Sequence, residues 1–120
     1  MELENLSGRD RTLLRETIRL RYETTREQLQ QVMAELEAML RKHPQLSDDK
    51  LRVRFNGFGE SYQEVELYGY AATGEWPEFT RIREEILLEV LAIVERSPTR
   101  LALPTEVHYV HGREGAQPGT

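Results

Sequence analysis

The sequence contains no cysteine, and this absence excludes several kinds of chemistry at once. Without cysteine there is no thiolate nucleophile, no disulfide and no cysteine ligand for zinc. Long apolar runs are also missing, because no window reaches the ~18 consecutive apolar residues of a membrane-spanning helix. The first residues, Met1 to Glu4, have neither a basic start nor an apolar stretch. We therefore expect no secretory signal there.

An excess of basic residues is missing as well. The 16 Lys and Arg side chains are outnumbered by 21 Asp and Glu, so the net charge is −5. This balance argues against a nucleic-acid partner or an anionic membrane surface. Residues 55–59 (Phe-Asn-Gly-Phe-Gly) are faintly similar to a glycine-aromatic motif of RNA-binding domains, but they fall in a predicted turn. We expect no binding of nucleic acid.

What the sequence does contain is an ordered alternation of two periodicities. Apolar residues recur at strand spacing, then at helix spacing, then in two further strands, one helix and one strand. The predicted segments are 12–22, 24–43, 51–56, 64–71, 76–96 and 103–109. This order predicts an α+β fold, a ferredoxin-like βαββαβ sandwich whose antiparallel four-stranded sheet carries two helices on one face. The predicted domain covers 11–110, between an N-terminal segment at 1–10 and a disordered tail at 111–120.

Local signals place the ends of these segments. Thr24 and Glu27 have the spacing of a capping box, with Thr24 as the N-cap of the first helix. His43-Pro44 ends that helix, and residues 45–50 are predicted to be a polar loop. Proline in Trp76-Pro77 suits the first turn of the second helix.

One face of the predicted sheet is left open by the helices, and it is strongly charged. The usual strand order of this fold puts the first strand between the third and the fourth. Acidic residues of the third strand then fall between two basic rows, and Tyr68 and Tyr70 share their face. Two interpretations remain open, a solvated and self-neutralised face or a surface that docks against another protein. The charged residues are Arg15, Arg19, Arg21, Arg52, Arg54, Glu64 and Glu66.

Nothing in the sequence has the pattern of a catalytic or metal site. Glu84 and Glu85 fall on the outward side of the second helix, where no burial would raise a carboxyl pKa for acid–base chemistry. His108 and His111 would point to opposite faces, so they form no chelating pair. Gly57-x-Gly59 is followed by no helix and is no phosphate loop. We predict no enzyme activity, no metal and no cofactor.

Residues spread along the whole chain carry a resemblance to a known family. They are Leu3-Glu4-Asn5-Leu6-Ser7, Arg9-Asp10-Arg11, Ile18-x-Leu20-Arg21-Tyr22-Glu23-Thr24, His43-Pro44, Val53-Arg54-Phe55-x-Gly57-Phe58-Gly59, Trp76-x-Glu78-Phe79-x-x-Ile82-Arg83-Glu84 and Leu103-Pro104-Thr105-Glu106-Val107-x-Tyr109. In this order they resemble the C-terminal cytoplasmic α/β domain of small-conductance mechanosensitive channels, the MscS-like family. The resemblance covers nearly all of 3–110. Ser97-Pro98 and Leu103 depart from the glycine and phenylalanine that the family usually has there.

The resemblance implies a place in a membrane channel. Such channels assemble as heptamers in which these domains form a hollow cytoplasmic cage that filters solutes, below a pore opened by membrane tension. Residues 1–10 would be the end of a preceding β domain, and the pore helices would lie upstream. The domain would then lie on the cytoplasmic side of the inner membrane, and it would contact the membrane only through those upstream segments.

The implied role is subunit assembly and solute filtering in osmotic-shock release. The alternative is a stand-alone ferredoxin-like regulatory module that binds a small ligand or a protein partner. Three leucines of the second helix widen its apolar stripe beyond what covering the sheet requires. For the channel, these leucines and four residues of the sheet are the candidate subunit contacts: Leu87, Leu88, Leu91, Tyr68, Tyr70, Arg19 and Arg21.

Overall fold

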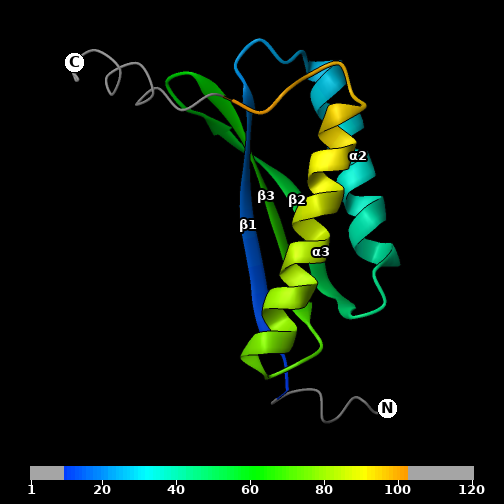
Figure 1. The fold of residues 1–120 in the computed structure, drawn as a ribbon. Coiled ribbons are helices and arrows are strands. Elements are labelled where there is room, and N and C mark those ends of the chain that lie inside the picture. The colour runs from blue at the N-terminus through cyan, green and yellow to red at the C-terminus, as the bar shows by residue number, and fades with distance from the viewer. Residues whose placement is uncertain (1–9, 103–120) are drawn as a thin grey trace, which may run out of the picture.

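The computed structural model describes residues 10–102 and shows two helices packed on one face of an antiparallel sheet (Figure 1). The elements are β1 (Thr12–Arg21), α2 (Arg26–Lys42), β2 (Leu46–Phe58), β3 (Tyr62–Ala71) and α3 (Trp76–Glu95). The strand order is β1-β3-β2. These findings confirm the α+β fold, the two helices and the position of the third strand between the first and the second.

The predicted fourth strand at 103–109 lies outside the described residues, as do 1–9 and the tail at 111–120. Residues 100–102 nevertheless lie along the edge of β1 that does not pair with β3. Leu101 forms an isolated antiparallel bridge with Leu20. The Ala102 amide donates to the Arg19 carbonyl at 2.8 Å, and the Arg21 amide donates to the Arg100 carbonyl at 3.0 Å.

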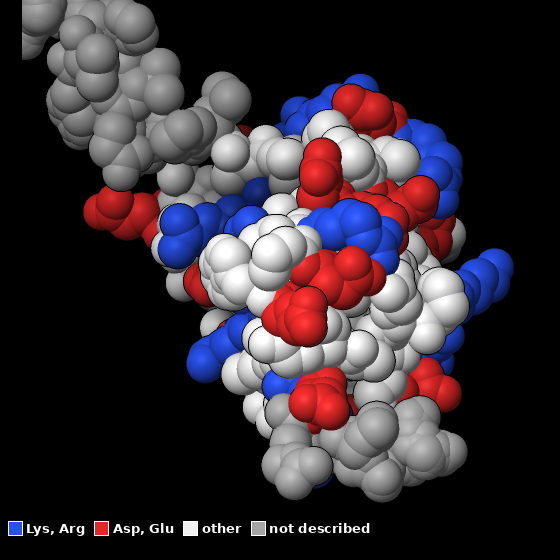
Figure 2. Space-filling view, turned by 60° about the horizontal axis from the view of Figure 1, so that its bottom comes forward, with Lys and Arg blue, Asp and Glu red and all other residues white. Residues whose placement is uncertain are grey.

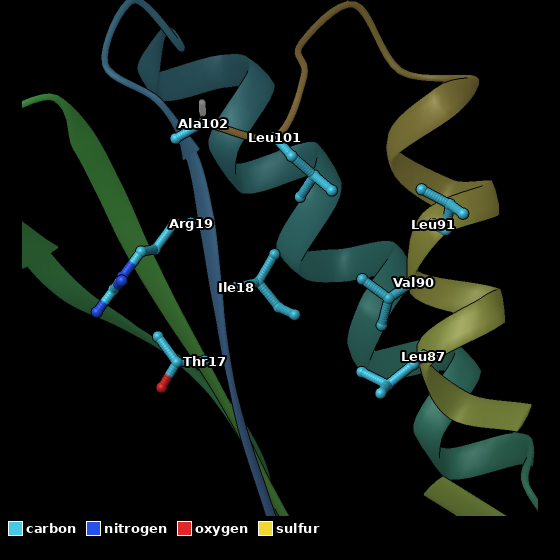
Figure 3. A pocket seen from close by; sticks show the side chains of 8 residues that line it. All are labelled: Thr17, Ile18, Arg19, Leu87, Val90, Leu91, Leu101 and Ala102. Atoms are coloured by element: carbon cyan, nitrogen blue, oxygen red, sulfur yellow. The ribbon is translucent and has the colours of Figure 1, made fainter. Parts of the chain in front are cut away.

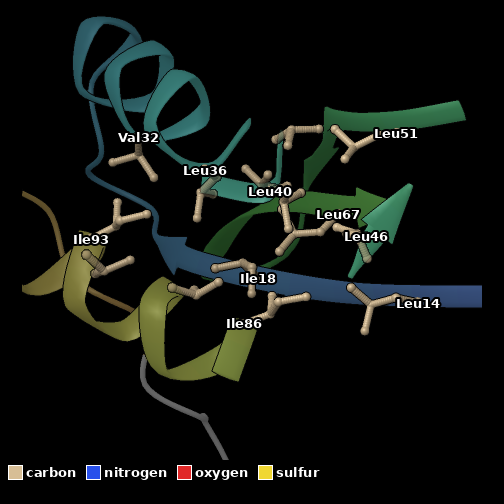
Figure 4. Close-up of a cluster of buried hydrophobic side chains, with 14 of the residues drawn as sticks. Leu14, Ile18, Val32, Leu36, Leu40, Leu46, Leu51, Leu67, Ile86 and Ile93 are labelled. Atoms are coloured by element: carbon tan, nitrogen blue, oxygen red, sulfur yellow. The ribbon is translucent and has the colours of Figure 1, made fainter. Parts of the chain in front are cut away.

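The core lies between the sheet and the helices, and the predicted periodicities produce it directly (Figure 4). The inward stripe predicted for α3 is buried as expected: Phe79, Ile82, Ile86, Val90, Ile93 and Val94. On β3 the inward side chains Val65, Leu67 and Ala71 are fully buried. Glu16 interrupts the apolar face of β1 because it forms an ion pair with Arg83 of α3.

The N-cap of α2 is Thr25, not Thr24 as predicted. The Thr25 hydroxyl accepts from the Gln28 amide at 3.1 Å, and the Gln28 side chain accepts from the Thr25 amide at 3.0 Å. Thr24 is buried, and its hydroxyl bonds the Arg21 carbonyl and the Thr99 hydroxyl. Both threonines have a residue three positions on that can complete a capping box, so spacing alone could not separate them.

The predicted polar loop at 45–50 is also wrong, because β2 begins at Leu46. Ser47 pairs with Tyr70, and after a register shift Arg52 pairs with Tyr68. Lys50, within the irregular stretch, has a positive φ of 61°. The extra residues interrupt the alternation of apolar and polar side chains, and this hides the start of the strand from the sequence pattern.

The tip of the β2–β3 hairpin differs from the prediction in a second way. Phe55, predicted among the inward residues of its strand, is 38% exposed, and Tyr22 is 54% exposed beyond the end of β1. A register shift follows Phe55, and Gly57 takes a φ of 117°, which suits glycine. The hairpin tip bends away from the helices (Figure 1), and Phe58 there is 69% exposed.

Candidate functional site

The open face of the sheet carries the charge lattice predicted from the sequence. Glu66 of β3 lies opposite Thr17 on one side and Arg54 on the other, and it forms an ion pair with Arg15. Glu64 lies opposite Arg19. Hydrogen bonding and attraction to Glu66 raise the pKa of Arg15 above its ordinary value, so this guanidinium stays charged. Opposite charges thus meet across neighbouring strands and neutralise much of this face.

The tyrosines of this face lie beneath arginine side chains. The Arg52 guanidinium lies 4.1 Å from the ring centre of Tyr68, and that of Arg11 lies 4.3 Å from Tyr70. The two rings also meet edge to face with their centres 6.3 Å apart. Cation–π contacts at exposed sites contribute about 0.5–1 kcal/mol each. These contacts within the chain favour the self-neutralised interpretation of the face.

The three predicted leucines belong to a different surface. Leu87 and Leu91 line a groove of about 560 Å³ between β1 and α3, together with Ile18, Val90 and Leu101 (Figure 3). Leu88, 58% exposed, lies further out on the helix. Arg19 also lines this groove, while its guanidinium lies over Tyr62 of the open face. The seven predicted contacts therefore form two surfaces, one on the sheet and one on α3, with Arg19 between them.

The sequence reasoning missed an apolar groove at the hairpin tip. Phe58, 69% exposed, meets Phe55 edge to face at 5.3 Å between ring centres and lies 6.3 Å from the ring of Tyr22. The groove, about 580 Å³, lies between these phenylalanines and the first half of α2, where Leu29 and Met33 line it. The two phenylalanines on either side of Gly57, Phe55 and Phe58, could have indicated this apolar surface. Because the sequence pattern predicts a turn in this segment, its side chains were not considered as a surface.

A polar network at the other end of the molecule was also missed. His43 Nε2 lies 2.9 Å from a carboxylate oxygen of Glu85, and the side-chain Nε2 of Gln45 donates to a carboxylate oxygen of Glu78 at 2.8 Å. Arg81 contacts Gln45, Glu78 and Glu85 together. Hydrogen bonds from Arg81 and Gln45 hold the pKa of Glu78 below its ordinary value. Figure 2 brings this end forward and shows acidic and basic side chains interspersed.

No metal or catalytic centre emerges from residues 10–102. Within that range no cluster of three or more potential ligand side chains could hold a metal ion. Neither described helix is long and apolar enough to cross a membrane. His108 and His111 lie outside the described residues. What the described surface offers is contact area, charged on the sheet and apolar at two edges.

Comparison with known proteins points to one family. Residues 15–97 match the family model described as mechanosensitive ion channel MscS, C-terminal. An uncharacterized MscS family protein of Aquifex aeolicus is 32% identical over 109 residues, which are 90% of this chain and 30% of the relative. The low conductance mechanosensitive channel YnaI of Escherichia coli is 27% identical over 95 residues, 78% of this chain and 27% of the relative.

The fold has solved counterparts as well. The structure of MSL1 from Arabidopsis thaliana superposes with a TM-score of 0.71 at 18% identity, covering 79% of this chain and 35% of that one. At this identity the likeness concerns the fold alone. The chain spans about a quarter to a third of the length of the curated relatives that it matches.

Proposed function

Because the chain belongs to the MscS family of mechanosensitive ion channels, as their C-terminal domain, we propose that it forms part of the cytoplasmic cage of a tension-gated channel. In this role it serves subunit assembly and filters solutes during release after osmotic shock. The family is one of ion channels and not of enzymes, in agreement with the sequence prediction. The observation that carries the proposal is the family match over 15–97.

The proposal places most of the channel outside this chain. Since the chain spans only part of its relatives, the pore would be formed by the remainder of the full-length protein. The cage would be a homo-oligomer, a heptamer by resemblance, on the cytoplasmic side of the membrane. Its subunit contacts would come from Leu87, Leu88 and Leu91 of α3, and we keep Tyr68, Tyr70, Arg19 and Arg21 as further proposed contacts.

We also propose that residues 103–109 form the fourth strand of the ferredoxin-like sheet, along β1. Extending the register of the Leu20–Leu101 bridge places Leu103 beside Ile18 and Val107 beside Leu14, both buried toward the helices. Leu103 would then cover the Leu87 side of the β1 groove. In this register the amides of Leu13 and Arg15 exchange slowly with solvent in the 120-residue chain and faster in a chain ending at Ala102. Equal exchange in both chains would refute the fourth strand.

The test of the channel role is the survival of bacteria that lack their own mechanosensitive channels after hypo-osmotic shock. Cells expressing the full-length gene product should survive the shock, because an opening pore releases osmolytes. A version lacking residues 11–110, expressed at the same level, should fail to assemble and should not rescue.

Failure of the full-length protein to rescue, when it is present in the membrane fraction, would contradict the channel role. That result would favour the regulatory-module alternative and a search for its ligand. Rescue by both versions would retain the channel but contradict the role of this domain in assembly.

A further inference from the structure

An outward stripe on α3 combines apolar and acidic side chains. Glu84, Leu88, Leu91 and Glu95 follow one another at spacings of four, three and four residues, which places them on one side of the helix. All four are exposed, Leu88 at 58% and Leu91 at 41%. Within residues 10–102 neither carboxylate of the stripe forms an ion pair, whereas Glu78 and Glu85 of the same helix do. The stripe is thus an apolar pair between two available negative charges.

The groove at the hairpin tip has the complementary character. Phe55 and Phe58 form one wall, and Leu29 and Met33 line the α2 side. Arg26 is the one charged residue among those that line the groove, and no carboxylate in the described part of the chain pairs with it. The groove therefore offers apolar walls and one available positive charge. Amphipathic helices bind in grooves of this kind through residues at i and i+3.

The stripe and the groove lie at opposite edges of the molecule. α3 forms its groove with β1, on one side of the three described strands, whereas α2 packs over β2, on the other side. A two-fold dimer would bring like patches together and leave the unlike patch of each copy uncovered. A head-to-tail contact covers both kinds on every copy, and it closes into a ring when the rotation between copies allows.

We propose that the α3 stripe of one copy binds in the hairpin groove of a second copy of this chain. Leu88 and Leu91 lie against Phe55 and Phe58 of that copy, and a carboxylate of the stripe faces its Arg26. This inference rests on the proposed assembly role and specifies which surfaces meet. The contact is heterologous, so each subunit uses one surface toward each of its two neighbours.

Because this chain contains no cysteine, cysteines introduced into it allow a test by cross-linking, made in a full-length channel from which any cysteine outside this chain has been replaced. Gln30 lines the groove and Leu88 lies on the stripe, so the variants Gln30→Cys and Leu88→Cys report on the proposed contact. We expect a short bismaleimide to join the two variants when they are co-expressed, and to join neither variant to itself. The matched control replaces Gln30→Cys with Ala38→Cys, also exposed on α2 but two turns further along, and should give at least fivefold less product.

A second pair of variants tests the role of the aromatic wall. Phe58→Ser should lower the yield of the Gln30–Leu88 cross-link severalfold. Trp76→Ser should leave it unchanged, although Trp76 and Phe58 are both 69% exposed, because Trp76 lies at the start of α3 outside the groove. A Leu88→Cys variant that cross-links to itself, or equal loss in both serine variants, would overturn the head-to-tail contact.

Osmotic-shock survival separates this inference from the proposed function. Channels that rescue the cells but give no Gln30–Leu88 cross-link would overturn the contact and leave the function intact. Loss of rescue by the unmodified full-length protein would overturn the function, whatever the cross-links show.

Discussion

Several single charged side chains on this domain are held by contacts within the chain. Glu16 enters the apolar face of β1 and meets Arg83 of α3, so one ion pair joins sheet and helix. Hydrogen bonding and attraction to Glu16 raise the pKa of Arg83. Arg52 and Arg11 lie over Tyr68 and Tyr70 instead of pointing into solvent. Charge alone is thus a poor guide to a docking site here, because several charges of the sheet face already have partners within the chain.

Glu78 provides a test of the network at the start of α3. Its pKa is lowered in the folded chain from an ordinary value of 4.5, so its contribution to stability is full above that pH and is lost as the pH falls through the lowered pKa. Glu78→Gln should lower the urea midpoint near neutral pH. The gap from the parent chain should close at a pH well below 4.5, where both forms are uncharged.

The control for this prediction is Glu89→Gln, on the same helix. Glu89 is exposed and forms no ion pair within residues 10–102, so this variant should track the parent chain at both pH values. A gap for Glu78→Gln that persists unchanged at low pH would show that the carboxylate charge is not what stabilises the network.

The apolar groove is formed by the ends of two elements, the β2–β3 hairpin and the N-terminus of α2. The tip of the β2–β3 hairpin bends away from the helices (Figure 1), Phe58 is exposed there, and the apolar groove lies between the hairpin and the first half of α2. The N-terminus of α2 forms the other side of that groove. Its cap therefore stabilises a wall of the proposed contact as well as the helix itself.

Thr25 as the N-cap of α2 makes a direct prediction. Thr25→Ala removes the acceptor of the Gln28 amide and should lower the free energy of unfolding by about 1 kcal/mol. Thr25→Asp keeps an acceptor at the cap and should stay close to the parent chain. Chemical denaturation of the 120-residue chain measures both, and an unchanged Thr25→Ala variant would contradict the assignment.

The molecule as a whole has two apolar patches of different character, the α3 stripe and the groove at the hairpin tip, and a sheet face on which opposite charges neutralise one another. Each patch is small, and specific stable interfaces usually bury about 1,200–2,000 Å² in total. Since the chain is about a quarter to a third of its relatives' length, we expect other parts of the full-length protein to supply much of the assembly surface.

The isolated 120-residue chain should accordingly be monomeric or weakly associated at micromolar concentration. Light scattering should give a mass near 14.0 kDa. Association should appear only at much higher concentration, and Phe58→Ser should weaken it more than Trp76→Ser. A stable ring formed by this chain alone would contradict the prediction.

The sequence by itself determined the two helices, the three described strands and the family. Helical and strand periodicities are local, and α3 shows this best, because each of its predicted inward residues is buried. Family membership could be inferred because matching residues are spread along the whole chain, so it did not depend on the exact end of any segment. The sequence did not determine whether Thr24 or Thr25 caps α2, and it did not determine where β2 begins.

The tertiary structure decided which distant residues meet, and with them the candidate contacts. The partner of Glu16 lies 67 positions away in the sequence, and the pairing register of β2 with β3 shifts at two places. The groove at Phe58 forms only where the β2–β3 hairpin and the first half of α2 come together. Such features follow from the packing of whole elements against one another, which no short-range pattern of residues records.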